Sequence, residues 1–195
     1  MQITDGRNHN TAKVDSANRV HTYATSQSET GNATHNGDAY NINSGFIAYT
    51  GTSESSLIYI KNNESRDLIV TAIAFGIGTL SATVTDSALV TVIRNPTGGD
   101  VVTDATAVGA NANLNFGSSK TLLVDAYAGK DGGTITGGND VVYFTADGNE
   151  RVFAPIEIHI PTGSSIGIKV DLNTSGGGNM YGAFVCHLED VDRED

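Results

Sequence analysis

The densest apolar run in the chain lies between Ser56 and Gly78, and a polar segment interrupts it at its centre. The β-branched and aromatic residues at 57–60 indicate a short strand, and a second apolar run at 68–77 indicates a longer one. The polar residues 61–67 between them predict the turn of a β-hairpin. One face of the longer strand carries Ile69, Ile73, Phe75 and Ile77, and the other carries Leu68, Val70, Ala72 and Ala74. Because both faces are apolar, we expect this strand inside a sheet, with a second layer over at least one face.

Apolar and polar residues alternate most regularly in the last third of the chain. Isoleucine alternates with glutamate and histidine over 156–160, and residues 166–172 repeat the alternation after a Pro-Thr-Gly-Ser-Ser turn. This period of two predicts strands with one buried and one wet face. A closing strand is expected at 181–188. Weaker strand signals occupy 46–49, 80–86, 88–94, 120–126 and 141–144.

No segment carries a helix signal, and turn residues separate the strands at the spacing of a sandwich or barrel. We therefore predict an all-β fold, a jelly-roll-like antiparallel β-sandwich over residues 45–188. Residues 1–44 show almost no apolar periodicity, so on their own they cannot offset the entropy of ordering. They predict either a disordered leader or an extended N-terminal arm that orders against neighbouring subunits. Residues 189–195 form an acidic C-terminal tail, and residues 97–119 indicate a long loop or excursion.

Composition supports an all-β fold, because only 17% of the residues are charged and the residues of long helices are sparse. The formal net charge of −11 and a pI near 4.6 argue against a nucleic-acid partner. The chain has neither a long apolar run nor an apolar leader, so we expect no membrane span and no signal peptide. The single cysteine, Cys186, shares a strand face with Phe184 and Leu188, which predicts a small core residue.

Catalytic and metal-binding motifs are absent from the sequence. It has no G-x-S-x-G, H-E-x-x-H, P-loop or G-x-G-x-x-G motif, and its five histidines are scattered. Glu157 and His159 are expected to form a solvated pair rather than part of a metal site. The Asp-Gly elements at 131–133 and 147–150 do not fit a calcium-binding loop, so turn chemistry is expected there. The sequence therefore predicts no catalytic residue, cofactor or metal.

A resemblance to a known group of proteins rests on three segments. An IYIKN-x-x-x-R-D-L-x-V-x-x-I run follows an arm that contains Asn-Arg, and an N-L-N-x-G-S-S-K segment comes later. Together they resemble the capsid decoration or cement proteins of tailed bacteriophages, which are head-stabilising virion structural proteins. The resemblance implies a subunit made in the host cytoplasm and carried on the capsid surface.

Such a subunit would contact the major capsid protein and neighbouring copies of itself, as a homotrimer by analogy with decoration subunits. The candidate capsid or subunit contacts are Arg19, Val20, Tyr23 and Tyr40. One alternative is a phage tail or fibre adhesin, or another TNF- or C1q-like binding module. That module would use recognition loops at 129–140 and 176–181. An enzyme on a β-sandwich is a third alternative, and no motif favours it.

Overall fold

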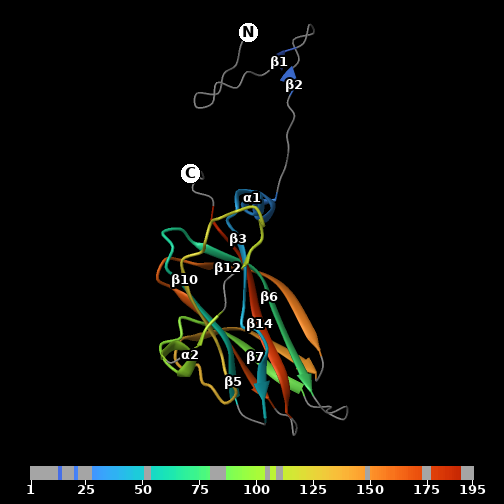
Figure 1. The fold of residues 1–195 in the computed structure, drawn as a ribbon, viewed down its shortest axis with the longest axis vertical. Helices are drawn as coiled ribbons and strands as arrows, with labels where there is room; N and C mark the ends of the chain where they lie inside the picture. Colours follow the sequence, from blue (N-terminus) through green and yellow to red (C-terminus); the bar gives the residue numbers. More distant parts are fainter. Residues whose placement is uncertain are drawn as a thin grey trace.

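The computed structural model describes residues 13–14, 20–21, 28–50, 54–79, 87–103, 106–108, 112–147, 150–172 and 177–189. The bounds of its elements are β1 Lys13–Val14, β2 Val20–His21, α1 Glu29–Asn36, β3 Ala39–Asn43, β4 Ile47–Tyr49, β5 Glu54–Asn62, β6 Leu68–Thr79, β7 Ser87–Arg94, α2 Asp100–Thr103, β8 Thr106–Ala107, β9 Ala112–Asn113, β10 Val124–Ala128, β11 Asn139–Asp147, β12 Arg151–Ile160, β13 Ser165–Leu172 and β14 Gly178–Leu188 (Figure 1).

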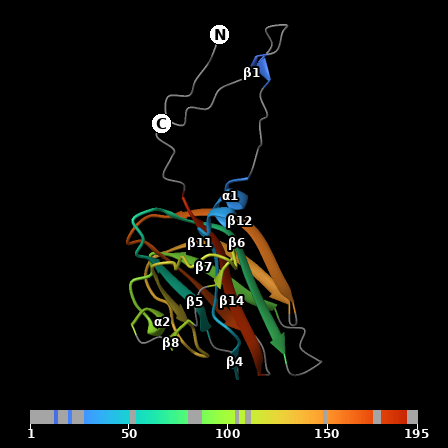
Figure 2. The same ribbon diagram turned by 45° about the horizontal axis from the view of Figure 1, so that its top comes forward.

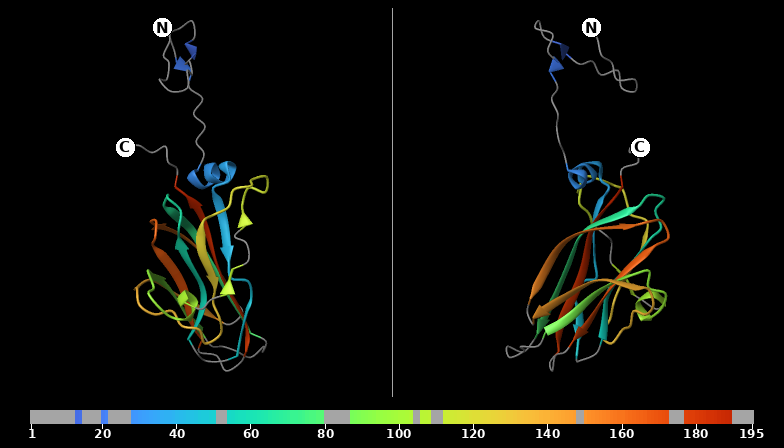
Figure 3. Two further views of the ribbon diagram at one scale, coloured as in Figure 1. Left: turned by 60° about the vertical axis from the view of Figure 1, so that its left-hand side comes forward. Right: turned by 180° about the vertical axis from the view of Figure 1, so that it is seen from behind.

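Two large antiparallel sheets stack face to face (Figure 3). Sheet I has the order β11-β7-β13-β5-β10-β8, and sheet II has the order β12-β6-β14-β3-β9, with β4 also paired to β14. β1 and β2 pair with each other in a separate small sheet. The predicted all-β antiparallel sandwich is thus confirmed. Consecutive strands β5 to β7, and again β11 to β14, alternate between the two sheets.

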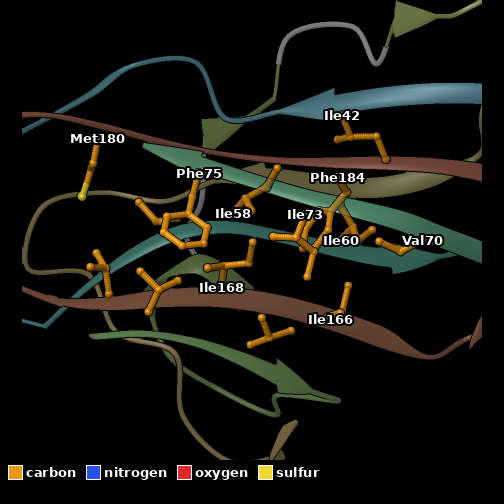
Figure 4. Packing of buried hydrophobic residues seen from close by; sticks show 14 of the residues in the cluster. Ile42, Ile58, Ile60, Val70, Ile73, Phe75, Ile166, Ile168, Met180 and Phe184 are labelled. Atoms are coloured by element: carbon orange, nitrogen blue, oxygen red, sulfur yellow. The ribbon is translucent and has the colours of Figure 1, made fainter. Parts of the chain in front are cut away.

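The hydrophobic core fills the space between the two sheets (Figure 4). The strands predicted from alternation supply it, since Ile160 of β12 and Ile168 of β13 are buried, and the outward residues of β12 are exposed. Cys186 is buried in this core, as predicted. Burial raises the pKa of its thiol to about 12, so the side chain behaves as a small apolar residue.

The predicted hairpin between β5 and β6 is wrong, because the two strands lie in different sheets. β5 pairs with β10 and β13, whereas β6 pairs with β12 and β14. The connection is instead an arch across the edge of the sandwich. Asn62 holds the arch by donating hydrogen bonds to the carbonyls of Arg66, at 2.9 Å, and Ile160, at 2.8 Å. Both strands can therefore bury apolar faces against each other across the core, while β6 lies inside its sheet as expected.

A β-bulge at Thr71 overturns the strict alternation expected along β6. Opposite β14, Ala72 pairs with Val185 and Val70 pairs with Cys186, so Thr71 has no partner residue. Its hydroxyl donates to the Val185 carbonyl at 3.2 Å. An extra residue switches the faces of the strand on either side of it. The core side of β6 therefore consists of Leu68, Val70, Ile73, Phe75 and Ile77.

The expected arm, residues 1–44, contains parts of the folded body. α1 is a helix that the sequence did not indicate, because its residues are weak helix formers. It is stabilised at its ends: the Ser28 hydroxyl accepts a hydrogen bond from the Gly31 N–H, and Gly37 closes the helix at φ 76°. β3 then joins sheet II beside β14. The boundary expected at residue 45 is therefore corrected, since residues 39–43 belong to the sandwich.

The loops expected at 97–119 and 129–140 place Val101 and Ile135 on the outer face of sheet I, whereas β8 extends the edge of sheet I and β9 extends the edge of sheet II. The first contains α2, β8 and β9, and an isolated bridge between Gly98 and Thr136 joins the two loops. The second is therefore partly packed down rather than free for recognition. Residues 80–86, expected as a strand, lie outside the described residues. The small cluster under the two loops consists of Tyr59, Ile93, Val101 and Ile135.

Candidate functional site

A groove of about 380 Å³ runs over the outer face of sheet II. Its lining residues come from β3, β6, β12 and β14 and from the link between β3 and β4. We call it the outer-face groove, and its residues are Asn41, Asn43, Gly45, Phe46, Ala74, Phe153, Tyr181, Ala183 and Val185. None of these residues carries a charge.

Small residues form the floor of the outer-face groove, and aromatic rings form its walls. Ala183 pairs with Ala74 across β14 and β6, and Ala74 pairs in turn with Phe153 on β12. Tyr181 lies over Gly76, where an added Cβ would collide with the tyrosine ring. The ring can therefore occupy this position over β6 only because residue 76 is glycine.

Phe46 forms a second wall from the link that joins β3 to β4. Ser44 fixes this link, because its N–H donates to the Gly182 carbonyl and its hydroxyl accepts from the Gly182 N–H, both at 2.9 Å. Gly45 follows with φ 69°, which turns the chain outward. The Phe46 ring then meets Tyr181 edge to face, with the ring centroids 5.8 Å apart.

The groove is open to solvent in spite of its apolar character. Phe46 is 81% exposed and Phe153 is 65% exposed. The only polar side chains in the lining, apart from the Tyr181 hydroxyl, are the amides of Asn41 and Asn43. The buried Oδ1 of Asn41 has no hydrogen-bond partner among the described residues. A surface of this kind suits an uncharged apolar partner and offers no nucleophile or base for catalysis.

A second exposed aromatic residue is Phe116, at the tip of a loop over residues 113–120, which we call the Phe116 loop. Asn113 and Asn115 each accept, through the side-chain oxygen, the backbone N–H two residues further on. The Asn115 amide also donates to the His35 carbonyl of α1 at 2.9 Å, which places the loop beside that helix (Figure 3). The loop is thus well hydrogen-bonded, and yet Phe116 is 96% exposed.

No family model matches this chain, and no curated protein matches its sequence.

Asp38 connects the Phe116 loop and the arch at the α1 end of the sandwich. Its carboxylate lies 2.9 Å from Lys120 Nζ, in the Phe116 loop, and 3.3 Å from Arg66 Nη2, in the arch. Burial acts to raise the pKa of Asp38, but the hydrogen bonds and charges of Lys120 and Arg66 together outweigh it, and the pKa is lowered. The charged carboxylate therefore stabilises both loops where they meet β3.

His187 is a buried titratable residue in the same part of sheet II. It is 2% exposed, and neither ring nitrogen has a hydrogen-bond partner among the described residues. Its Nε2 lies 3.9 Å from Oε1 of Glu29 on α1. Burial lowers its pKa, against the opposing effect of the Glu29 and Glu157 carboxylates, and His159 lowers it further. The neutral imidazole is thus the favoured form.

The structure does not gather the predicted contact residues into one site. Tyr40 is 1% exposed, and its hydroxyl donates to the Gly37 carbonyl at 3.1 Å. This burial corrects the expectation that Tyr40 contacts a partner, because its ring belongs to the core. Val20 lies in β2, but the structure does not describe its side chain. Arg19 and Tyr23 lie outside the described residues.

The polar residues considered for metal binding have other partners. His159 and Glu157 form an exposed pair at 3.3 Å, as predicted. The Asp131 carboxylate accepts hydrogen bonds from the N–H and the hydroxyl of Thr50, at 3.0 and 2.7 Å. The part of the chain that the structure describes contains no cluster of three metal-ligating side chains. Within the same part, no helix has the length and apolar character needed to span a membrane.

Sequence analysis missed the outer-face groove because its walls come from residues far apart in the chain. Phe46, Phe153 and Tyr181 each occupy a different element, and only the pairing of sheet II brings them together. One signal could have pointed to it: if the strand predicted at 156–160 is extended toward the N-terminus, Phe153 falls on the same wet face as Glu157 and His159. A large aromatic residue on a wet face indicates an interaction surface.

Proposed function

We propose that this chain is a non-enzymatic virion structural protein that decorates and stabilises a bacteriophage capsid. The observation that carries the proposal is the outer-face groove, an uncharged aromatic surface on a strongly acidic protein. Exposed aromatic patches without charge are typical of protein–protein interfaces. In this function the groove makes subunit contacts, and the major capsid protein and neighbouring copies are the partners.

Two of the three segments that resemble decoration proteins meet in the fold, and this supports the proposal. Arg66 belongs to the R-D-L part of the first segment, and Lys120 ends the N-L-N-x-G-S-S-K segment. Both bind the same carboxylate, that of Asp38. These two segments therefore belong to one structural unit, at the end of the sandwich next to α1 (Figure 2).

A phage tail adhesin, or another TNF- or C1q-like binding module, is the second candidate function. The observation in its favour is the size and lining of the groove, because a volume of about 380 Å³ with aromatic walls and two amides is also typical of a small-ligand site. Under this function the protein would lie at the tail tip, and the groove would face a host ligand.

Particles produced with and without the gene for this chain test the proposal. Cryo-electron microscopy is expected to show the sandwich on the head shell, and heads that lack it are expected to lose their contents at a lower temperature. Heads without the chain are then incubated with purified variants. Phe153→Ser should weaken binding to these heads about tenfold, as expected when an interface aromatic is removed.

Tyr143→Ser is the matched control, because Tyr143 is a 58% exposed aromatic residue on sheet I, away from the groove. It should bind heads like the unmodified protein. Density at the tail tip would instead favour the adhesin, and absence from purified particles would exclude both functions.

A further inference from the structure

We propose that the Phe116 loop of one copy inserts into the outer-face groove of a neighbouring copy. This inference rests on the proposed function in one respect, namely that the groove serves assembly. It goes further by naming the occupant of the groove and the side chain that enters it. The resulting contact joins two different surfaces of the same chain.

The Phe116 loop has the properties of a preformed anchor. Its tip is held by side-chain hydrogen bonds from Asn113 and Asn115, and Lys120 fixes its end to Asp38. Phe116 therefore loses little conformational freedom when it binds. Rigid aromatic side chains that enter a pocket are the usual centres of binding energy at interfaces. A 96% exposed phenylalanine on a rigid loop has no evident role in folding.

The outer-face groove can receive such a ring. Phe46 and Tyr181 already pack edge to face at 5.8 Å, and Phe153 lies across the alanine floor. A third ring between these walls can make the tilted aromatic contacts that add about 0.5–1.5 kcal/mol beyond area burial. The volume of about 380 Å³ leaves room for the ring and the adjoining backbone of the loop.

Charge limits where two copies of this chain can meet. The chain carries a net charge of −11, so two copies repel each other over most of their surfaces. The groove lining has no charged side chain, and the Phe116 loop has none before Lys120. These uncharged surfaces can therefore meet without placing like charges in contact.

The two surfaces cannot meet within one copy. Asn113, at the base of the Phe116 loop, pairs with Tyr40 near the α1 end of β3. Phe46 follows the opposite end of that strand, next to β4, which lies away from α1 (Figure 2). The five residues of β3 separate them by about 15 Å. A contact between different surfaces is heterologous, and such contacts close into rings or extend into filaments. The homotrimer expected for a decoration subunit would be a closed ring of this kind.

Two variants, each lacking one half of the contact, test the inference. Phe116→Ser removes the inserted ring, and Phe153→Ser removes one groove wall; both positions are exposed, so both variants should fold. Sedimentation velocity is expected to find the unmodified protein as an oligomer and each variant alone as a monomer near 20.3 kDa.

Mixing the two variants gives the decisive result. The intact groove of Phe116→Ser can receive the intact loop of Phe153→Ser, so the mixture should form a one-to-one dimer that neither variant forms alone. Tyr143→Ser, whose ring lies on sheet I, should assemble like the unmodified protein. Far-UV circular dichroism confirms that each variant is folded.

A monomer at all concentrations for the unmodified protein overturns the inference, and so does a mixture of variants that forms no dimer. Full assembly of Phe116→Ser alone also overturns it. These outcomes are separate from the test of function: a chain found on heads but monomeric in solution would keep the proposed function and remove this contact. A protein that assembles through Phe116 but is absent from particles would keep the contact and remove the function.

Discussion

Replacement of Ile168 by alanine tests the packing of the core. Ile168 lies on β13 at the centre of sheet I, between Ile58 of β5 and Val92 of β7, and it is 0% exposed. Its side chain shares the space between the sheets with Phe75 of sheet II (Figure 4). The substitution removes three carbon atoms from a fully buried position.

The expected loss follows from transfer and cavity contributions. Three carbons at about 0.8 kcal/mol each give a transfer loss of about 2.4 kcal/mol. The cavity left between two hydrogen-bonded sheets can collapse only in part, so the total loss of unfolding free energy should be about 3–4 kcal/mol. For a domain of this size that corresponds to a fall of about 10 °C in the melting temperature.

Urea unfolding followed by far-UV circular dichroism measures the effect. We expect a lower midpoint with an unchanged slope, because the substitution alters stability rather than the area exposed on unfolding. Lys169→Ala is the control on the same strand. Its Nζ lies 2.9 Å from Oε2 of Glu54 in a partly exposed pair, so the loss should stay below about 1 kcal/mol. A loss below about 1 kcal/mol for Ile168→Ala would refute the assignment of this residue to a close-packed core.

Three further predictions concern the α1 end of the molecule and its charges. Removing residues 1–44 should lower the melting temperature, because β3 and its buried residue Ile42 leave sheet II, whereas removing residues 1–27 keeps α1 and β3 and should lower it less; equal melting temperatures for the two truncations would contradict this. The pKa of Asp38 is lowered in the folded state, so its charged carboxylate stabilises the fold above the ordinary pKa near 3.8, and this stabilisation is lost as the pH falls through the folded pKa. Asp38→Asn should therefore reduce the pH dependence of urea unfolding in that range. Because the folded pKa of His187 is also lowered, the unfolded chain binds the proton first as the pH falls below about 6.5; stability should decline there, and His187→Asn should remove part of that decline.

The regular parts of the fold were predictable because alternation reports burial directly. β12 follows its sequence pattern over 156–160, β13 buries the four apolar residues that the pattern indicates although Gly167 on its expected wet face is also buried, and Cys186 takes the core position that its neighbours indicate. Alternation fails where the backbone departs from a period of two, as at Thr71. Alternation also does not show which strands pair. Two strands joined by a polar segment therefore predicted a hairpin, where the structure has an arch between β5 and β6.

Elements stabilised by a few polar contacts were harder to predict. α1 depends on its end caps rather than on helix-forming residues, and β3 has a polar sequence that reveals its two core residues only when it is paired with β14. The outer-face groove is lined by residues from four strands. The sequence does not show that Phe46 and Phe153 lie near each other. Tertiary pairing, rather than local preference, therefore determines the candidate site.

The position of β14 has a consequence for how the protein is made. This strand lies between β6 and β3 in sheet II and also pairs with β4, so it holds together segments translated at very different times. Until residue 188 has left the ribosome, β3 and β6 cannot be joined, and the edge of β6 that pairs with β14 stays without a partner strand. Non-local pairing of this kind folds slowly and exposes aggregation-prone strands in the meantime. Production of the protein should therefore benefit from chaperones that protect nascent chains, and truncations that remove β14 should give insoluble product rather than a smaller folded domain.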